Sequence, residues 1–330
     1  MSLYRQVVEA AFEALRIETP TNFSWYGEPI APLPAEVVEQ MGAEATRAYL
    51  CDRLRNHLYG SFYCTGRPVP WESGRSLGRP PGASVFIDAL SRANHGTGSR
   101  EAGWGVMGTE GDGRIVVRRH GLSLWVRPDE VHGDLAAGSE VSVTMPSELL
   151  RLSPGFYMAL GNEELDGEEL IIRHYWHLSS GGGAALVAAG TRLLNEAGLP
   201  FRLKVLIDPA LYTRCDAGVL YTPKRLRSEV AGVLPALRAA VGEHLRPGTP
   251  ALTKPLGGGL GLAEDPPGGD SFGMDRCGLL AEAMVRSAEL GPQTREERLA
   301  LVERTFGERG VDLDRPYLNA DSADEYESVT

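Results

Sequence analysis

The second half of the chain alternates short runs of β-type residues with helical segments, and this alternation constrains the fold more than any other feature. Residues 167–178, 201–208 and 218–223 are rich in Ile, Val, Leu and aromatic residues, which is typical of strands. Residues 179–198 and 224–245 carry apolar positions at helical spacing, and Pro235 predicts a kink or break in the second of these helices. A sheet with flanking helices follows from this order of elements.

The first half has a different pattern. Residues 1–16 and 34–58 repeat the helical spacing, whereas 103–146 contain short β-type runs separated by Gly and Asp, which favour a small meander or barrel-like sheet. Residues 251–277 are too glycine-rich to predict regular structure.

We therefore predict an α+β fold in three parts. An N-terminal helical region and small β-rich segment (residues 1–146) would pack on a C-terminal mixed β-sheet with flanking helices (residues 147–312). The acidic tail, residues 313–330, has the composition of a disordered segment.

Composition excludes several classes of protein. A net charge of −11 argues against broad binding to nucleic acid, which needs a basic surface. No apolar run approaches the roughly 18 residues of a membrane span, and the N-terminus has no secretory signal. The four cysteines are far apart and lack metal-ligand spacing. We expect a cytoplasmic protein with reduced thiols.

Lysine is scarce in this chain. Of 33 basic residues only three are lysines, Lys204, Lys224 and Lys254, and the other 30 are arginines. A GC-rich coding bias explains a general replacement of Lys by Arg. A position that keeps Lys against this bias is a candidate for a titratable amine, because Arg cannot lose its proton at physiological pH.

Period-two alternation predicts which side chains share a face of the sheet. In the first strand Arg173, Tyr175 and His177 fall on one side, and in the strand after the helix Arg202 and Lys204 share one side. A solvated sheet face is the ordinary explanation for such polar residues. However, this set contains no carboxylate, and an all-cation face instead favours an anion pocket.

Two glycine-rich segments are further candidates for anion binding. The loop 251–277 holds Lys254 and Arg276, and the turn 179–183 precedes a helix, although a simple linker explains the turn equally well. Neither segment is a Walker A or dinucleotide motif. His174 and His177 fall on opposite sides of a strand, which argues against a shared metal ion.

Several ordered motifs of the second half resemble one known family. They are GFYMALG (155–161), RHYWHL (173–178), FRLKVLID (201–208), LYTPKR (220–225), TKPLGGGLGLAEDP (253–266) and SFGMDRC (271–277). Together they resemble the HopA-type effector family, founded on type III secretion effectors of plant pathogens. The resemblance covers residues 140–280. Relatives of this family also occur in bacterial class V lanthipeptide and thioamitide gene clusters.

What the resemblance implies is a phosphoserine/phosphothreonine lyase. In those clusters a kinase-like partner phosphorylates a precursor peptide, the HopA-like protein eliminates the phosphate, and a cyclase is a further candidate partner. The reaction needs a base, cations for the phosphate and an acid, but no metal or organic cofactor. The resemblance and the cationic face together assign Lys204 as base, His177 or Tyr175 as acid, and Arg173, Arg202, Arg225, Lys254 and Arg276 as phosphate ligands.

Two other functions stay open. A non-catalytic HopA-like effector or peptide-binding module would use the same polar face for docking. A phosphatase or kinase is less well supported, because a P-loop cysteine and a paired-carboxylate metal site are absent from the sequence.

Overall fold

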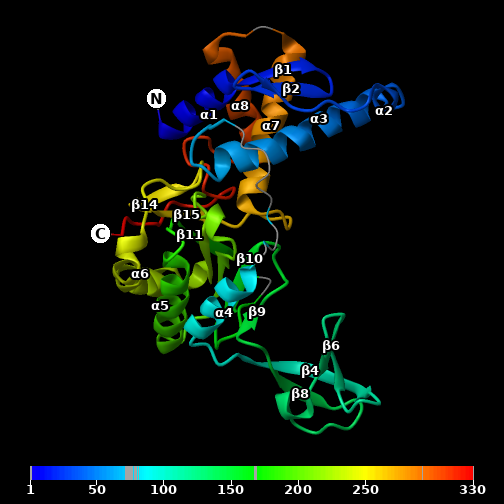
Figure 1. The fold of residues 1–330 in the computed structure, drawn as a ribbon, viewed down its shortest axis with the longest axis vertical. Helices are drawn as coiled ribbons and strands as arrows, with labels where there is room; N and C mark the ends of the chain where they lie inside the picture. The colour runs from blue at the N-terminus through cyan, green and yellow to red at the C-terminus, as the bar shows by residue number, and fades with distance from the viewer. Residues whose placement is uncertain are drawn as a thin grey trace.

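A computed structural model describes residues 2–70, 77, 80, 82–166, 169–291 and 293–329. Its helices and antiparallel sheets confirm the α+β fold. Figure 1 shows three parts in succession along the long axis: a helical end, a central sheet, and a small sheet that projects at the opposite end. None of the helices in the described ranges is long and apolar enough to cross a membrane.

The helical end combines both termini of the sequence. Ser2 caps the first helix by accepting a hydrogen bond from the Arg5 amide at 3.4 Å, and Ser271 caps α7 in the same way. Residues 15–29 form a three-stranded sheet, and the helical pattern over 34–58 is divided near Gly42 into two helices. The elements are α1 (Leu3–Ala14), β1 (Leu15–Thr19), β2 (Asn22–Trp25), β3 (Glu28–Pro29), α2 (Ala35–Glu39), α3 (Ala43–Leu58), the π-helix η1 (Tyr59–Tyr63), α7 (Phe272–Leu290) and α8 (Arg295–Gly307).

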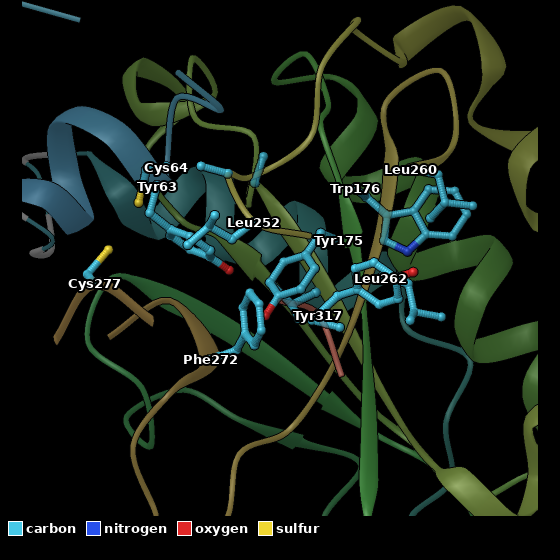
Figure 2. Close-up of a cluster of buried hydrophobic side chains, with 14 of the residues drawn as sticks. Tyr63, Cys64, Tyr175, Trp176, Leu252, Leu260, Leu262, Phe272, Cys277 and Tyr317 are labelled. Atoms are coloured by element: carbon cyan, nitrogen blue, oxygen red, sulfur yellow. The ribbon is translucent and has the colours of Figure 1, made fainter. Parts of the chain in front are cut away.

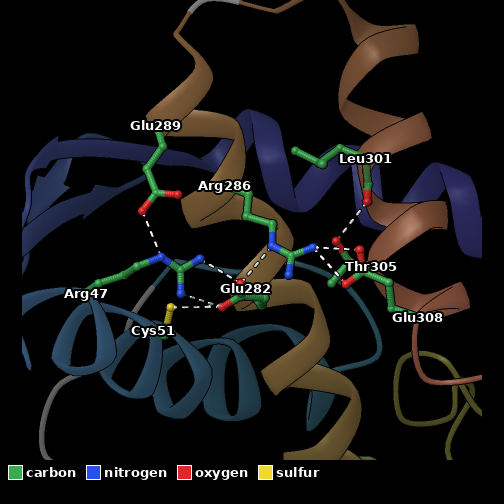
Figure 3. Close-up of polar contacts among 8 residues, drawn as sticks. All are labelled: Arg47, Cys51, Glu282, Arg286, Glu289, Leu301, Thr305 and Glu308. Carbon is green, nitrogen blue, oxygen red and sulfur yellow. Dashed lines mark hydrogen bonds and ion pairs between the residues drawn. The ribbon is translucent and has the colours of Figure 1, made fainter. Parts of the chain in front are cut away.

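A network of ion pairs connects α3, α7 and α8 (Figure 3). Arg47 of α3 lies 2.6 Å from Glu282 and 2.8 Å from Glu289, both on α7. Arg286 shares Glu282 at 2.8 Å and reaches Glu308, which follows α8, at 2.8 Å. The early helix and the late helices are therefore held together by charge as well as by apolar packing.

The central sheet has seven strands in the order β14-β15-β11-β13-β12-β10-β9. Every described pairing is antiparallel, although a mixed sheet was expected. Pro235 lies inside one continuous helix, α6, and does not break it. The elements are α4 (Ala83–Ala93), β9 (Glu148–Leu149), β10 (Phe156–Leu160), β11 (Ile171–Trp176), α5 (Gly182–Glu196), β12 (Arg202–Leu206), β13 (Gly218–Pro223), α6 (Arg227–Ala240), β14 (Lys254–Gly257) and β15 (Leu260–Glu264). Residues 167 and 168 of the strand predicted over 167–178 lie outside the described residues.

Different elements pack against the two faces of this sheet. Ile172 and His174 of β11 line a cavity whose other walls come from α6 and the C-terminal tail, so this face is turned towards the helices. Tyr175, on the opposite face, packs against Tyr63 of η1 and Phe272 of α7. The second face therefore lies between the sheet and the helical end of the molecule.

The glycine-rich segment 251–277 was wrongly predicted to be irregular, because it contains the hairpin β14–β15. Gly259 has φ +74°, and a Cβ there would lie 2.5 Å from the carbonyl oxygen of Arg246. A Cβ at Gly261 would lie 2.9 Å from side-chain atoms of Thr249 and Thr253. These glycines let the hairpin sit directly on residues 246–253, rather than on a bound anion.

The small sheet is a separate structural unit. Its strands are β4 (Arg100–Thr109), β5 (Ile115–Arg119), β6 (Leu122–Val126), β7 (Val131–His132) and β8 (Glu140–Thr144), in the order β6-β5-β4-β8-β7. Trp104, Val117 and Val143 belong to its own apolar core, distinct from the main core. The expected packing of this segment on the C-terminal sheet is therefore wrong, and Figure 1 shows it projecting away from the body.

The C-terminal tail was predicted to be disordered, and the structure contradicts this. The tail has no regular secondary structure after residue 321, yet Tyr326 and Val329 are buried in the main core. The Val329 amide donates to the carbonyl oxygen of Leu256 on β14 at 2.6 Å, and the Tyr326 hydroxyl donates to Glu264 at 2.7 Å. Apolar anchors and specific hydrogen bonds hold the segment despite its acidic composition.

Candidate functional site

The candidate site is one face of the central sheet, which we call the Lys204 face. Its rows follow from the strand register: Arg173 on β11 is opposite Tyr221 on β13, which is opposite Arg202 on β12. In the next row Tyr175 and Lys204 flank Val219. The predicted grouping is therefore confirmed, but the two strands are not neighbours, because β13 lies between them. The Lys204 face consists of Arg173, Tyr175, Arg202, Lys204, Tyr221 and Asp265.

Lys204 is held by aromatic rings. Its Nζ lies 4.5 Å from the ring centroid of Phe156 and 5.5 Å from that of Tyr221. Neither a hydrogen bond nor an ion pair joins Lys204 to any residue within the described ranges. A cation placed against ring faces is attracted by their π-electrons, but its N–H groups remain available to a ligand.

Arg173 is a buried cation with a carboxylate partner. Its Nη2 lies 2.5 Å from Asp265 Oδ1, and its guanidinium carbon lies 5.0 Å from the Tyr221 ring centroid. The side chain is only 10 % exposed. Its Nε nevertheless has no hydrogen-bond partner among the described residues. Buried N–H groups normally have a partner, so this donor is available to a ligand.

Tyr175 provides a second buried donor beside it. Figure 2 shows Tyr63, Tyr175 and Phe272 on one side of the strand and Trp176 on the other. The ring centroids of Tyr63 and Tyr175 are 6.3 Å apart, and burial raises the pKa of the Tyr175 hydroxyl. The Tyr63 hydroxyl interacts with this hydroxyl and lowers its pKa, against the larger effect of burial, although the contact does not have the geometry of a normal hydrogen bond. Arg173 and Tyr175 thus place two buried donors on the same face of the sheet.

The expectation of an all-cation face is wrong. Burial raises the pKa of Asp265, although Arg173 and Lys204 oppose the shift. Asp216 is fully buried, which would raise its pKa, but Arg214 and Lys204 outweigh this effect and the pKa is lowered. Lys204 therefore lies in the field of two carboxylates without bonding to either. Positions on separate strands and loops supply these carboxylates, so alternation within one strand could not reveal them.

His177, which follows β11, lines a cavity. Its Nδ1 is 2.8 Å from the carbonyl oxygen of Pro247, which makes Nδ1 the donor and leaves Nε2 as the acceptor. Burial lowers the pKa of His177. The ring lines a cavity of about 570 Å³ together with Thr65, Cys215 and Thr249, and Lys204 is not among the described residues of its wall. No hydrogen bond joins the predicted acid His177 to the predicted base among the described residues, although the charge of Asp216 interacts with both.

Both remaining lysines are engaged with carboxylates and with the C-terminal tail. Lys224 Nζ lies 2.6 Å from Glu264, which is itself buried. Lys254 Nζ lies 2.6 Å from Asp324 and donates to the carbonyl oxygen of Tyr326 at 2.5 Å. The predicted phosphate ligand Lys254 is therefore a partner of the tail in this structure, and it does not join the Lys204 face.

The predicted ligands Arg225 and Arg276 are also engaged away from Lys204. Arg225 Nε lies 2.8 Å from Glu169. Arg276 is buried, pairs with Asp275, and donates to two main-chain carbonyl groups of residues 316–318 at 2.8 and 3.0 Å. Of the five predicted phosphate ligands, only Arg173 and Arg202 are on strands of the Lys204 face, and Arg276 interacts from α7 with the charge of Tyr175.

The turn 179–183 has no room for an anion. A Cβ at Gly182 would lie 2.7 Å from the His244 side chain, and a Cβ at Gly183 would lie 2.2 Å from the Tyr212 hydroxyl. These glycines admit two neighbouring side chains to the start of α5. The anion cradle predicted there is replaced by packing.

Sequence reasoning missed Tyr221, Asp265 and Asp216. Tyr221 could have been found, because it occupies the correct alternate position of the strand 218–223. Asp265 lies in the quoted motif TKPLGGGLGLAEDP, but the pairing of β15 with β11 that brings it to Arg173 is a long-range feature. Within the described ranges, no group of three His, Cys, Asp or Glu side chains is arranged to hold a metal ion.

The chain is similar to known proteins in sequence and in structure. Residues 145–318 match the model of the HopA1 effector protein family. The effector protein from Pseudomonas syringae pv. tomato strain DC3000 has a similar structure, with 15% sequence identity and TM-score 0.48, covering 83% of this chain and 95% of that chain. The effector protein from Pseudomonas syringae pv. syringae strain 61 matches with 17% identity and TM-score 0.44, covering 82% and 96%. No curated protein matches the sequence.

Proposed function

The chain belongs to the HopA1 effector protein family, and from this premise we propose that it is a lyase that removes phosphate from phosphorylated Ser or Thr of a ribosomally made precursor peptide. The product would be dehydroalanine or dehydrobutyrine. One observation carries the proposal: Lys204 has no hydrogen-bond or ion-pair partner among the described residues, and it shares a sheet face with the buried Arg173, whose Nε also lacks a hydrogen-bond partner there.

The availability of its amine distinguishes Lys204 as the base. A base must offer its lone pair to the Cα proton, so its amine must be open to the substrate. Lys224 and Lys254 each have a carboxylate oxygen 2.6 Å from Nζ, whereas Lys204 contacts rings. The unengaged amine is the one that a substrate can approach.

Arg173 and Arg202 would hold the phosphoryl group. Arg173 can keep Asp265 on Nη2 and offer its Nε–H to a phosphate oxygen, so binding does not require the ion pair to break. Arg202 is exposed and forms no ion pair with a described residue, which leaves its fork of donors free at the rim. Together they would offset the two negative charges of the phosphoryl group.

Residues of the Lys204 face can account for each proton transfer of the elimination. Lys204 takes the Cα proton, the released electron pair forms the Cα=Cβ bond, and the Cβ–O bond breaks towards phosphate. Tyr175, which lies in the same row of the sheet as Lys204, would donate the proton to the leaving oxygen. Acid–base groups of this kind typically contribute about 10²–10⁴-fold each. The reaction changes no oxidation state overall and requires no cofactor.

The partners follow from the same proposal. A kinase-like protein would supply the phosphorylated precursor peptide, and a cyclase would consume the dehydrated product, as in class V lanthipeptide and thioamitide pathways. All these steps would take place in the cytoplasm, where the peptide is made.

A non-catalytic HopA-like effector or peptide-binding module is the second candidate. The observation that favours it is the pairing of most predicted phosphate ligands with carboxylates or carbonyl groups, as Arg225 and Arg276 illustrate. Under this alternative the cations stabilise the fold, and Lys204 contributes only to docking.

One experiment separates these functions. A phosphoserine-containing peptide is incubated with the protein in the presence of a chelator, and its mass is followed. Loss of phosphoric acid to leave a dehydroamino acid supports the lyase. Recovery of unmodified Ser identifies a phosphatase, and an unchanged mass with measurable binding identifies a binding module; either result would contradict the proposal.

A further inference from the structure

The edges of the three sheets are protected, with one exception. Unpaired edge strands tend to join other chains, and proteins block them with short strands, charges, proline, bulges or covering segments. Edges β3, β7 and β9 are two residues long, and β3 ends in Pro29. Edge β1 carries exposed Arg16 and Glu18 and a bulge. Edge β14 contains Pro255 and is covered by the tail.

Strand β6 is the exception. It pairs with β5 in regular register through all five residues, Leu122–Val126, and contains no charge and no proline. Leu122 is 56 % exposed and Trp125 is 53 % exposed. The sheet projects from the body, so this edge is open along its length in Figure 1. An apolar edge left open in this way indicates a docking surface.

The turn before β6 determines which backbone groups are free. His120 and Gly121 have φ +48° and +81°, the conformation of a two-residue type I′ hairpin turn. In such a hairpin the pair that closes the turn, Arg119 and Leu122, exchanges hydrogen bonds, and alternate pairs follow this pattern. Ser123 and Trp125 therefore direct their N–H and C=O groups away from β5. Only another extended backbone matches this spacing of donors and acceptors.

We propose that the free edge of β6 docks an extended segment of the peptide substrate as an added β-strand. The inference rests on the proposed function, since it assigns a second contact to the same peptide. Trp125 would pack against apolar side chains of the peptide on one face of the added strand, and Leu122 and Leu124 on the other. The small sheet would thereby hold one segment of the peptide while a phosphorylated residue reaches Lys204.

An exposed arginine beside β6 indicates which charge the docked peptide carries. Arg118 is exposed, lies opposite Ser123, and donates from Nε to the Ser123 hydroxyl at 3.1 Å. It has no carboxylate partner within the described ranges. An acidic side chain opposite Ser123 would form an ion pair with Arg118. The docked segment is therefore expected to alternate apolar residues with an acidic one.

The test measures binding to a synthetic probe by fluorescence anisotropy. The probe is a fluorescein-labelled peptide of alternating valine and threonine with one central glutamate, and a second probe carries N-methyl groups on every other amide. Trp125→Lys places on β6 the charge that protected edges carry. Met107→Lys is the matched control, because Met107 is 51 % exposed on β4, a central strand of the same sheet.

The expected result is binding by the wild-type and Met107→Lys proteins, with a loss of about tenfold or more in Trp125→Lys and for the N-methylated probe. Absence of wild-type binding, or equal binding by Trp125→Lys, would overturn the proposal. So would a wild-type dimer in sedimentation that Trp125→Lys abolishes, because the edge would then pair with a second copy. Lys204→Arg should still bind the probe, so a failed elimination assay leaves this test intact.

Discussion

Beside the C-terminal tail, Lys224 and Lys254 each lie 2.6 Å from a carboxylate, whereas Lys204 on β12 lies 4.5 Å from an aromatic centroid and bonds to no described residue. The first region uses lysine to hold the tail. The second keeps an amine near carboxylates without bonding to them.

This difference shows that the number of cations in a region says little about its function. The tail brings Asp324 to Lys254 and packs beside the pair of Lys224 with Glu264. Near Lys204 the carboxylates are committed instead to arginines, Asp216 to Arg214 and Asp265 to Arg173. Arginine therefore acts as the counter-ion that leaves the lysine free.

The largest effect on stability is expected from Arg173→Met. Removing one partner of a buried ion pair leaves the other charge uncompensated, and Asp265 is partly exposed, so we expect a loss of roughly 3 kcal/mol in the free energy of unfolding. Elimination activity should also be lost. Urea unfolding and the mass assay measure the two effects.

The double variant Arg173→Met/Asp265→Asn separates the effect on stability from the effect on activity. It should regain most of the stability, because no charge is left unpaired, but it should not regain activity. Recovery of elimination in the double variant would show that Arg173 does not hold the phosphate.

The opposite face of the sheet predicts a pH dependence. Burial lowers the pKa of His174 to about 4 from its ordinary value of 6.5. The unfolded chain therefore takes up a proton at a higher pH than the folded one, so this stability is complete above pH 6.5 and is lost as the pH falls towards 4. The loss between pH 7 and pH 5 is about 2 kcal/mol.

His174→Phe tests this assignment in urea unfolding at both pH values. The difference between pH 7 and pH 5 should shrink by that amount, although His57, whose pKa is also lowered to about 4, keeps part of the slope. An unchanged slope in His174→Phe would show that the imidazole is not buried in solution.

A smaller effect is expected from shortening the chain after Ala320. Burial of Tyr326 and Val329 would be lost, but the freed backbone regains entropy, so the net loss is about 1 kcal/mol. Elimination should persist, because the tail contacts Lys224 and Lys254 but not the Lys204 face. Loss of activity in a folded, shortened chain would mean that the tail-bound lysines belong to the site.

The local pattern of the sequence predicted part of this structure. Period-two alternation placed Arg173 and Tyr175 on the same face as Lys204, because strand geometry depends only on neighbouring residues. The α+β class followed for the same reason. The carboxylate of Asp265 reaches Arg173 only through the pairing of β15 with β11, which no local pattern encodes.

Composition was a poorer guide than alternation. The tail was predicted to be disordered from its charge. However, buried Tyr326 and Val329 anchor it, and its Asp324 forms an ion pair with Lys254. The glycines at 259 and 261 suggested an irregular loop, but they admit backbone and threonine atoms to a regular hairpin. In both segments the tertiary partner decides the conformation, and a single sequence does not show it.

The central claim is that the unengaged lysine, and neither of the paired ones, carries the chemistry. Lys204→Arg, Lys224→Arg and Lys254→Arg keep the charge, and their thermal unfolding shows whether each variant is folded. In one elimination assay with a phosphoserine peptide, we predict that Lys204→Arg loses about 10²–10⁴-fold in rate and that the other two remain close to wild type. Near-wild-type turnover by Lys204→Arg, or an equal loss in Lys224→Arg or Lys254→Arg, would contradict the account.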